Sequence, residues 1–118
     1  MRQKTGRKQM NLEVDKEAIK ILRPLKEEES FHFYTAVGEP TGENAGSLSN
    51  FYEKIKSIDP ESLNFHIQRK DFQNWIKKTL GDSKLARRIS RIRPLYDDNL
   101  RSKICTTVEN RIKELREA

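Results

Sequence analysis

The chain of 118 residues contains few of the residues from which metal sites and most enzyme active sites are built: one cysteine and two histidines. Cys105 has no second cysteine with which to form an internal disulfide bond, and its place among apolar positions predicts a small residue in or beside the core. His32, His66 and Cys105 do not have the spacing of zinc ligands. The stretch 38–46 has three glycines but no Gly-Lys-Ser/Thr, so it is not a P-loop. We therefore expect neither a metal site nor a cofactor.

Long apolar runs are also lacking. No stretch approaches the roughly 20 apolar residues that a membrane-spanning helix needs, and the polar, basic residues 1–9 lack the apolar region of a signal peptide. We therefore expect a cytoplasmic protein without membrane contacts. Residues 1–10 show no apolar periodicity and are predicted to be a disordered basic tail, followed by a single helical domain over residues 11–118.

Charge is abundant but unevenly distributed. Charged residues make up 36% of the chain and hydrophobic residues 34%, which predicts a lean core under a heavily charged surface. Residues 10–65 carry eleven acids and six cations, whereas residues 66–95 carry nine cations and two acids. This asymmetry indicates a charged partner without identifying it.

Apolar residues recur at helical spacing through most of the chain. The predicted helical stretches are residues 14–25, 48–58, 60–67, 72–80, 85–92 and 97–118. Asp59, Asp71 and Asp82 each precede such a stretch, and Asp15 lies at the start of one. All four are predicted N-caps, and Gly81 suits a helix C-terminus. The pattern predicts a mainly α fold, a compact bundle of five or six helices.

Residues 31–37 form the one segment with a different pattern. Phe31, Phe33, Thr35 and Val37 alternate as in a strand, but no second strand is evident to pair with them. The sequence leaves this segment open between a short extended piece and a buried helix. Residues 38–46 are predicted to be a loop, and the path of residues 27–46 stays undetermined.

Two clusters of residues between Phe33 and Ile89 form a recognisable combination. The first cluster is Phe33, Gly38, Thr41-Gly42, Ala45, Ser47-Leu48 and Phe51. The second is Ser62-Leu63, His66, Arg69, Asp71-Phe72, Trp75-Ile76, Leu80-Gly81-Asp82, Leu85-Ala86 and Ile89. The combination resembles an uncharacterised prokaryotic family, largely archaeal, that is classed as a domain of unknown function. The resemblance implies a small helical domain and no particular activity.

The most informative feature is a basic helical face within residues 69–93. Lys84, Arg87, Arg88 and Arg91 are spaced i, i+3, i+4 and i+7, which places them on one face of a helix. Like charges at i,i+4 cost about 0.2–0.5 kcal/mol per pair, and no acid within this helix offsets that cost. Phosphates, the acidic half of the chain or an acidic partner protein could do so. The candidate anion-binding residues are Arg69, Lys70, Lys77, Lys78, Lys84, Arg87, Arg88, Arg91 and Arg93.

His66, Arg69 and Asp71 form a second candidate polar site. His66 and Arg69 share a helix face at i,i+3, while Asp71 is explained as an N-cap. No nucleophile accompanies them in the sequence, so the pattern favours structural hydrogen bonding at a helix junction over acid–base catalysis.

The sequence thus favours a non-enzymatic interaction or regulatory module that binds an unidentified protein. Nucleic-acid binding through the basic face of residues 69–93 is the alternative, and a small enzyme with a site near His66 is a third. Whether the chain is a monomer or a homodimer is left open.

Overall fold

A computed structural model of the chain describes residues 16–93 and 98–117. The predicted basic tail, residues 1–10, and the predicted N-cap Asp15 lie outside the described residues.

The described part of the chain is mainly α, as predicted. Residues 16–22 are helical. The further elements are η1 (Glu27–Glu29), β1 (Phe31–Ala36), β2 (Glu39–Ala45), α2 (Leu48–Ile55), α3 (Pro60–Arg69), α4 (Asp71–Trp75), η2 (Ile76–Leu80), α5 (Ser83–Ser90) and α6 (Leu100–Glu117). The short segment η1 is a 3-10 turn, and η2 continues α4 as a π-helical turn.

Local sequence explains where several helices begin and end. Asp82 caps α5, as predicted, because its carboxylate accepts the backbone N–H of Leu85 at 3.1 Å. Gly81 ends the preceding turn with φ +83°, a left-handed conformation that glycine adopts without strain. Asp59 occupies the N-cap position of α3, but its side chain makes no capping hydrogen bond. Pro60 follows at the first helical position, where its missing N–H costs nothing.

The predicted loop over residues 38–46 is wrong, because most of it is a strand. β2 pairs antiparallel with β1, with Phe31 opposite Ala45 and Ala36 opposite Glu39. A two-residue turn at residues 37–38 joins the strands, and Gly38 provides its positive φ. The segment that the sequence left undecided is therefore extended and has a partner. Five of the seven residues of β2 are exposed, which explains the absence of an alternating apolar pattern.

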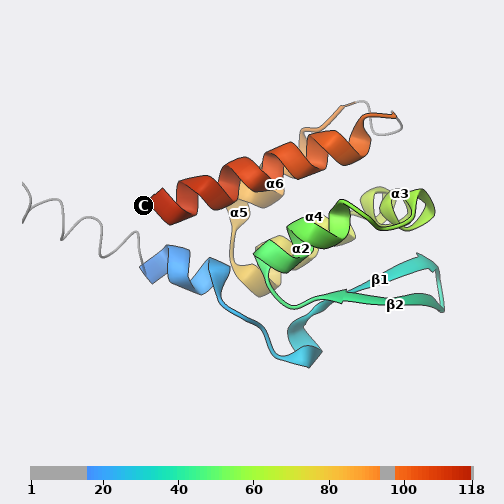
Figure 1. Cartoon of the computed structure of the whole chain (residues 1–118), viewed down its shortest axis with the longest axis horizontal. Helices are drawn as coiled ribbons and strands as arrows, with labels where there is room; N and C mark the ends of the chain where they lie inside the picture. The colour runs from blue at the N-terminus through green and yellow to red at the C-terminus, as the bar shows by residue number, and fades with distance from the viewer. Residues whose placement is uncertain (1–15, 94–97, 118) are drawn as a thin grey trace, which may run out of the picture.

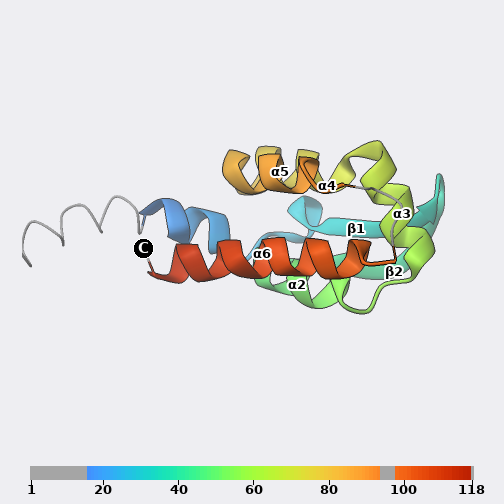
Figure 2. The same ribbon diagram turned by 90° about the horizontal axis from the view of Figure 1, so that it is seen from above.

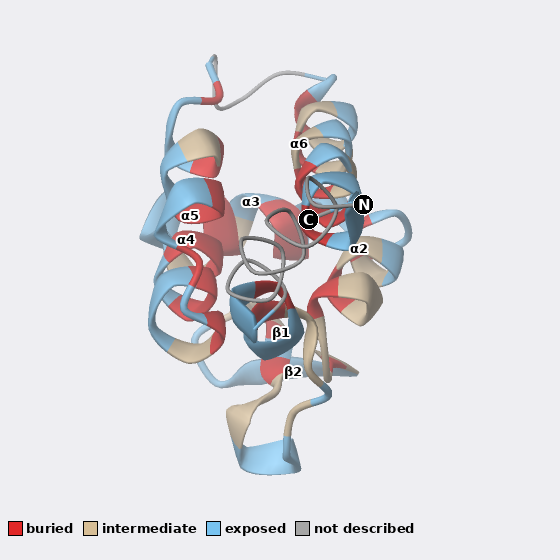
Figure 3. Ribbon diagram, turned by 90° about the vertical axis from the view of Figure 1, so that its left-hand side faces the viewer, coloured by how far each residue is buried: buried red, intermediate tan, exposed pale blue. Residues whose placement is uncertain are grey.

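The elements surround one core. α4 and α5 lie on one side, and α2 and α6 lie on the other (Figures 2 and 3). The hairpin lies across the opposite end of the domain from α6 (Figure 1), where β1 packs on α3 and β2 on α2. Figure 3 shows the buried residues facing inward between these layers.

Aromatic rings fill the centre of the core. Phe31 and Phe33 reach it from β1, and Phe51 and Phe72 from helices on either side. The Phe31 ring centroid lies 4.9 Å from that of Phe33 and 5.3 Å from that of Phe72. Trp75 is buried at the same centre. Cys105 is half-buried beside the core, as its apolar neighbours predicted.

Candidate functional site

The exposed cations of α5 and of its C-cap residue form a ridge. Its members, called the α5 ridge below, are Lys84, Arg87 and Arg91. The opposite side of the helix is buried, as predicted from the apolar spacing. None of the three ridge cations makes an ion pair with a residue that the structure describes. Their mutual repulsion is therefore not offset within the described part of the domain.

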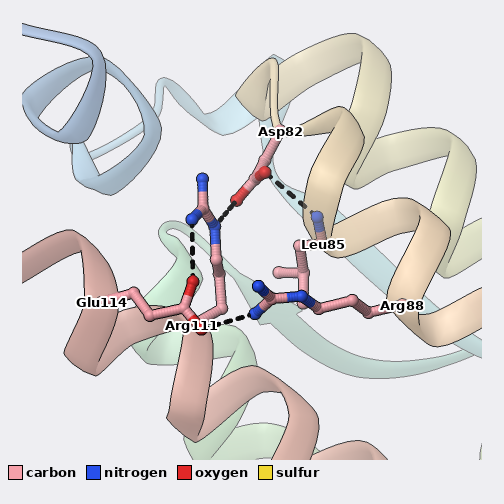
Figure 4. Close-up of polar contacts among 5 residues, drawn as sticks. All are labelled: Asp82, Leu85, Arg88, Arg111 and Glu114. Atoms are coloured by element: carbon pink, nitrogen blue, oxygen red, sulfur yellow. Dashed lines mark hydrogen bonds and ion pairs between the residues drawn. The ribbon is translucent and has the colours of Figure 1, made fainter. Parts of the chain in front are cut away.

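Arg88, the fourth cation of the predicted stripe, has a partner in the chain. Its Nη1 donates to Oε2 of Glu114 on α6 at 2.7 Å, and Figure 4 shows it turned toward that carboxylate. This hydrogen bond, with a second one from Arg111, holds the pKa of Glu114 below its usual value. For Arg88, the acid that offsets its charge therefore comes from the same chain: it is Glu114 on α6.

A buried ion pair lies beneath this contact. Arg111 on α6 donates from Nε to Oδ2 of Asp82 at 2.8 Å and from Nη1 to Oε1 of Glu114 at 3.1 Å (Figure 4). The side chains of Asp82 and Arg111 are only 2% and 8% exposed. Asp82 therefore caps α5 and neutralises a buried guanidinium with the same carboxylate. This pair fixes the N-terminus of α5, and with it the ridge, against α6.

Two further cations line a groove between α4, η2 and α5. The groove is about 380 Å³ in volume, and its lining residues are Lys70, Gln73, Asn74, Lys77, Ser83, Ala86, Arg87 and Ser90. It contains cations, amides and hydroxyls but no carboxylate. Gln73 is buried, and its Oε1 has no hydrogen-bond partner. We call this concavity the basic groove.

The remaining candidate cations lie elsewhere. Arg93 folds back on the end of α5, where its Nη1 donates to the carbonyl oxygens of Ser90 at 2.9 Å and Ile92 at 2.7 Å. Lys78 is exposed on η2 and does not line the groove. Arg69 lies at a different site, beside His66. Of the candidate cations, Lys70, Lys77 and Arg87 line the basic groove.

The structure brings His66, Arg69 and Asp71 together. Oδ2 of Asp71 lies 2.8 Å from Nδ1 of His66 and accepts from Nε of Arg69 at 3.1 Å. The prediction that Asp71 is an N-cap is wrong. It is the first residue of α4, and the cap position belongs to Lys70, whose φ of +63° turns the chain between α3 and α4. That turn directs the Asp71 carboxylate back toward α3.

Both ring nitrogens of His66 are in hydrogen bonds. Nε2 accepts the backbone N–H of Tyr34 at 2.8 Å, so the proton is on Nδ1, which donates to Asp71. Burial lowers the pKa of His66, while the Asp71 contact opposes that shift. The neutral imidazole connects β1 to the α3–α4 junction and has no free lone pair with which to accept a proton.

Three residues at these sites did not stand out in the sequence. Arg111 lies in the apolar stripe of α6, where its spacing was the only signal of burial. Gln73 lies beside Phe72 without any pattern of its own. Tyr34 belongs to β1, and its contact with His66 spans 32 residues, so no local pattern reveals it.

The fold and these sites define a mainly helical domain with a cationic ridge, a basic groove and a polar cluster under the hairpin. Comparison with protein-family models, curated proteins and solved structures found no match to this chain. The resemblance to an archaeal family therefore stays a prediction. Among the described residues, no helix is both long and apolar enough to cross a membrane.

Proposed function

We propose that the domain is a non-enzymatic binding module that contacts the sugar–phosphate backbone of a nucleic acid through the α5 ridge and the basic groove. The observation that carries this proposal is the chemistry of the groove, whose cations lie beside amides and hydroxyls without a carboxylate. Cationic, amide and hydroxyl side chains together make most of the contacts to phosphate and sugar in nucleic-acid complexes.

The unpaired ridge supports a polyanion. Lys84, Arg87 and Arg91 have no acidic partner among the described residues. A polyanion can therefore pair with all three cations without breaking an existing ion pair. Arg88 differs, because binding through it would compete with Glu114.

The test is fluorescence anisotropy of labelled single-stranded and duplex DNA and RNA at a series of salt concentrations. If Lys70, Lys77 and the three ridge cations all contact phosphates, log K falls with log salt at a slope of about −4.5 for duplex DNA and about −3.5 for single strands. Reversal of the ridge, Lys84→Glu with Arg87→Glu and Arg91→Glu, removes most of that affinity while the fold survives, because no ion pair is lost.

A matched control has the same net charge but leaves the ridge intact: Lys16→Glu with Lys113→Glu and Arg116→Glu, all at exposed positions. Equal affinity of the two triple variants would refute the assignment of the ridge. Polyglutamate serves as a competitor. If it displaces the nucleic acid at equal charge concentration, the surface recognises carboxylates as readily, and an acidic protein becomes the better partner.

A further inference from the structure

A second concavity lies on the hairpin side of α3 and α4. Its volume of about 400 Å³ is within the range of small-molecule sites. Its lining includes four aromatic residues (Phe31, Tyr34, Phe65 and Trp75) and two histidines. This aromatic cavity shares no lining residue with the basic groove. Aromatic walls favour a flat ring, which can stack on them.

Arg69 at the rim of this cavity is held in place with its outer edge free. Its Nε donates to Asp71, and its guanidinium carbon lies 5.0 Å from the Phe65 ring centroid. Nη1 and Nη2 make no hydrogen bond to a described residue. A guanidinium that is already oriented loses little further freedom on binding, and its two terminal nitrogens match a pair of acceptors on one edge of a ligand.

Several of the other polar groups of the cavity are already hydrogen-bonded, whereas Arg69 offers a ligand the two terminal nitrogens of its guanidinium. His66 is neutral, and both its nitrogens are occupied. Oδ2 of Asp71 accepts from both His66 and Arg69, and the indole N–H of Trp75 donates to the carbonyl oxygen of Glu29 at 2.8 Å. Tyr34 is half-buried, and its hydroxyl makes no hydrogen bond to a described residue.

We propose that the aromatic cavity binds a nucleobase, a flat ring with adjacent acceptors on one edge, which stacks on Tyr34 and accepts from the terminal nitrogens of Arg69. Guanine is the best match, because its O6 and N7 form the acceptor pair that arginine binds with two hydrogen bonds. The base could belong to a free nucleotide or to an unpaired position in a single strand. Binding of a base within a strand rests on the proposed function, whereas binding of a free nucleotide does not.

Trp75 provides the measurement. It is the only tryptophan of the chain and lines the cavity, so its fluorescence reports occupancy directly. The full chain is titrated with each of the four nucleoside 5′-monophosphates and with short single-stranded oligonucleotides. Excitation at the red edge of the indole absorption avoids the bases. We expect a saturable change in emission that is strongest with guanine.

Two variants locate the binding. Arg69→Gln and Tyr34→Leu are each expected to weaken it about tenfold. Their matched controls, Arg116→Gln and Tyr52→Leu, change the same residue types outside the cavity and leave the affinity unchanged. Urea unfolding of all four variants verifies that each is folded under the titration conditions.

The outcomes separate this proposal from the proposed function. A response to mononucleotides that persists in the ridge-reversed triple variant supports the cavity even if the ridge binds no nucleic acid. A response to oligonucleotides alone identifies the unpaired base of a strand as the ligand. The proposal is overturned if no nucleotide or oligonucleotide changes Trp75 emission up to about 1 mM, or if Arg69→Gln and Tyr34→Leu respond like their controls.

Discussion

Replacing Asp82 by alanine is expected to destabilise the domain more than its single side chain suggests. The change removes the cap of α5, worth about 1 kcal/mol. It also leaves the Arg111 guanidinium buried without its main partner, which costs about 3–5 kcal/mol. Since Arg111 keeps its contact with Glu114 at 3.1 Å, the lower end of that range applies. The sum is about 4 kcal/mol, a large part of the roughly 5–15 kcal/mol by which small domains are stable.

Urea unfolding followed by far-UV circular dichroism measures this loss as a shift of the midpoint at constant slope. Asp82→Asn keeps a capping acceptor and loses only the charge, so it is expected to cost about 3 kcal/mol. Asp59→Ala is the matched control, because Asp59 also occupies an N-cap position but makes no capping hydrogen bond. Its cost is expected to stay below about 1 kcal/mol. If Asp82→Ala costs no more than Asp59→Ala, the reasoning about the buried pair is wrong.

Three further predictions concern other parts of the fold. Burial lowers the pKa of His66 below its ordinary value of 6.5, so the unfolded chain binds more protons between pH 6.5 and the lower folded pKa. The free energy of unfolding therefore falls as the pH drops across that window. His66→Gln should flatten that part of a stability–pH curve, and an unchanged curve would contradict the assignment. Gly81→Ala, at φ +83°, is expected to cost about 1–2 kcal/mol in urea unfolding, whereas Gly46→Ala, where φ is not positive, serves as a control with a smaller cost. Phe33→Ala is expected to cost about 3–5 kcal/mol because the ring is fully buried; a cost below about 1 kcal/mol in thermal unfolding would show that the hairpin is not part of the core.

The helices could be predicted because their signals are local. Leu85, Ile89 and Ile92 recur at helical spacing, and all three are buried on the inner side of α5 or just after it. Asp82 followed by Ser83 gives a local capping signal that the structure bears out. Each of these inferences uses residues within one or two turns of helix, where geometry links spacing directly to burial.

The sequence suggested only the first strand of the hairpin, and left it undecided between an extended piece and a buried helix. β1 has aromatic and β-branched residues, but β2 contains Pro40, Gly42 and Asn44, types that are depleted in strands. β2 forms because it pairs with β1 and packs against α2, and not because of its own propensity. A strand stabilised by its neighbours leaves little trace in its own sequence.

The candidate sites divide in the same way. His66 and Asp71 are five residues apart, and their proximity could be read along the chain. The contact of Arg88 with Glu114 spans 26 residues, and that of Arg111 with Asp82 spans 29. Sequence spacing placed Arg88 correctly on an outer face of α5 but could not show that α6 supplies its carboxylate. Pairing between distant elements is decided by tertiary packing.

The hairpin also bears on whether strands of other molecules can pair with this domain. Both strands of a two-stranded sheet are edge strands, and open edges can recruit strands from other molecules. On β1, the N–H of Tyr34 is already bonded to His66, so a side chain of α3 occupies a position that an incoming strand would need. On β2, Pro40 has no N–H to offer, and Glu39 brings a like charge to any second copy. A hairpin protected in this way can stay exposed on the surface of the protein, even in concentrated solution, without nucleating cross-β aggregates.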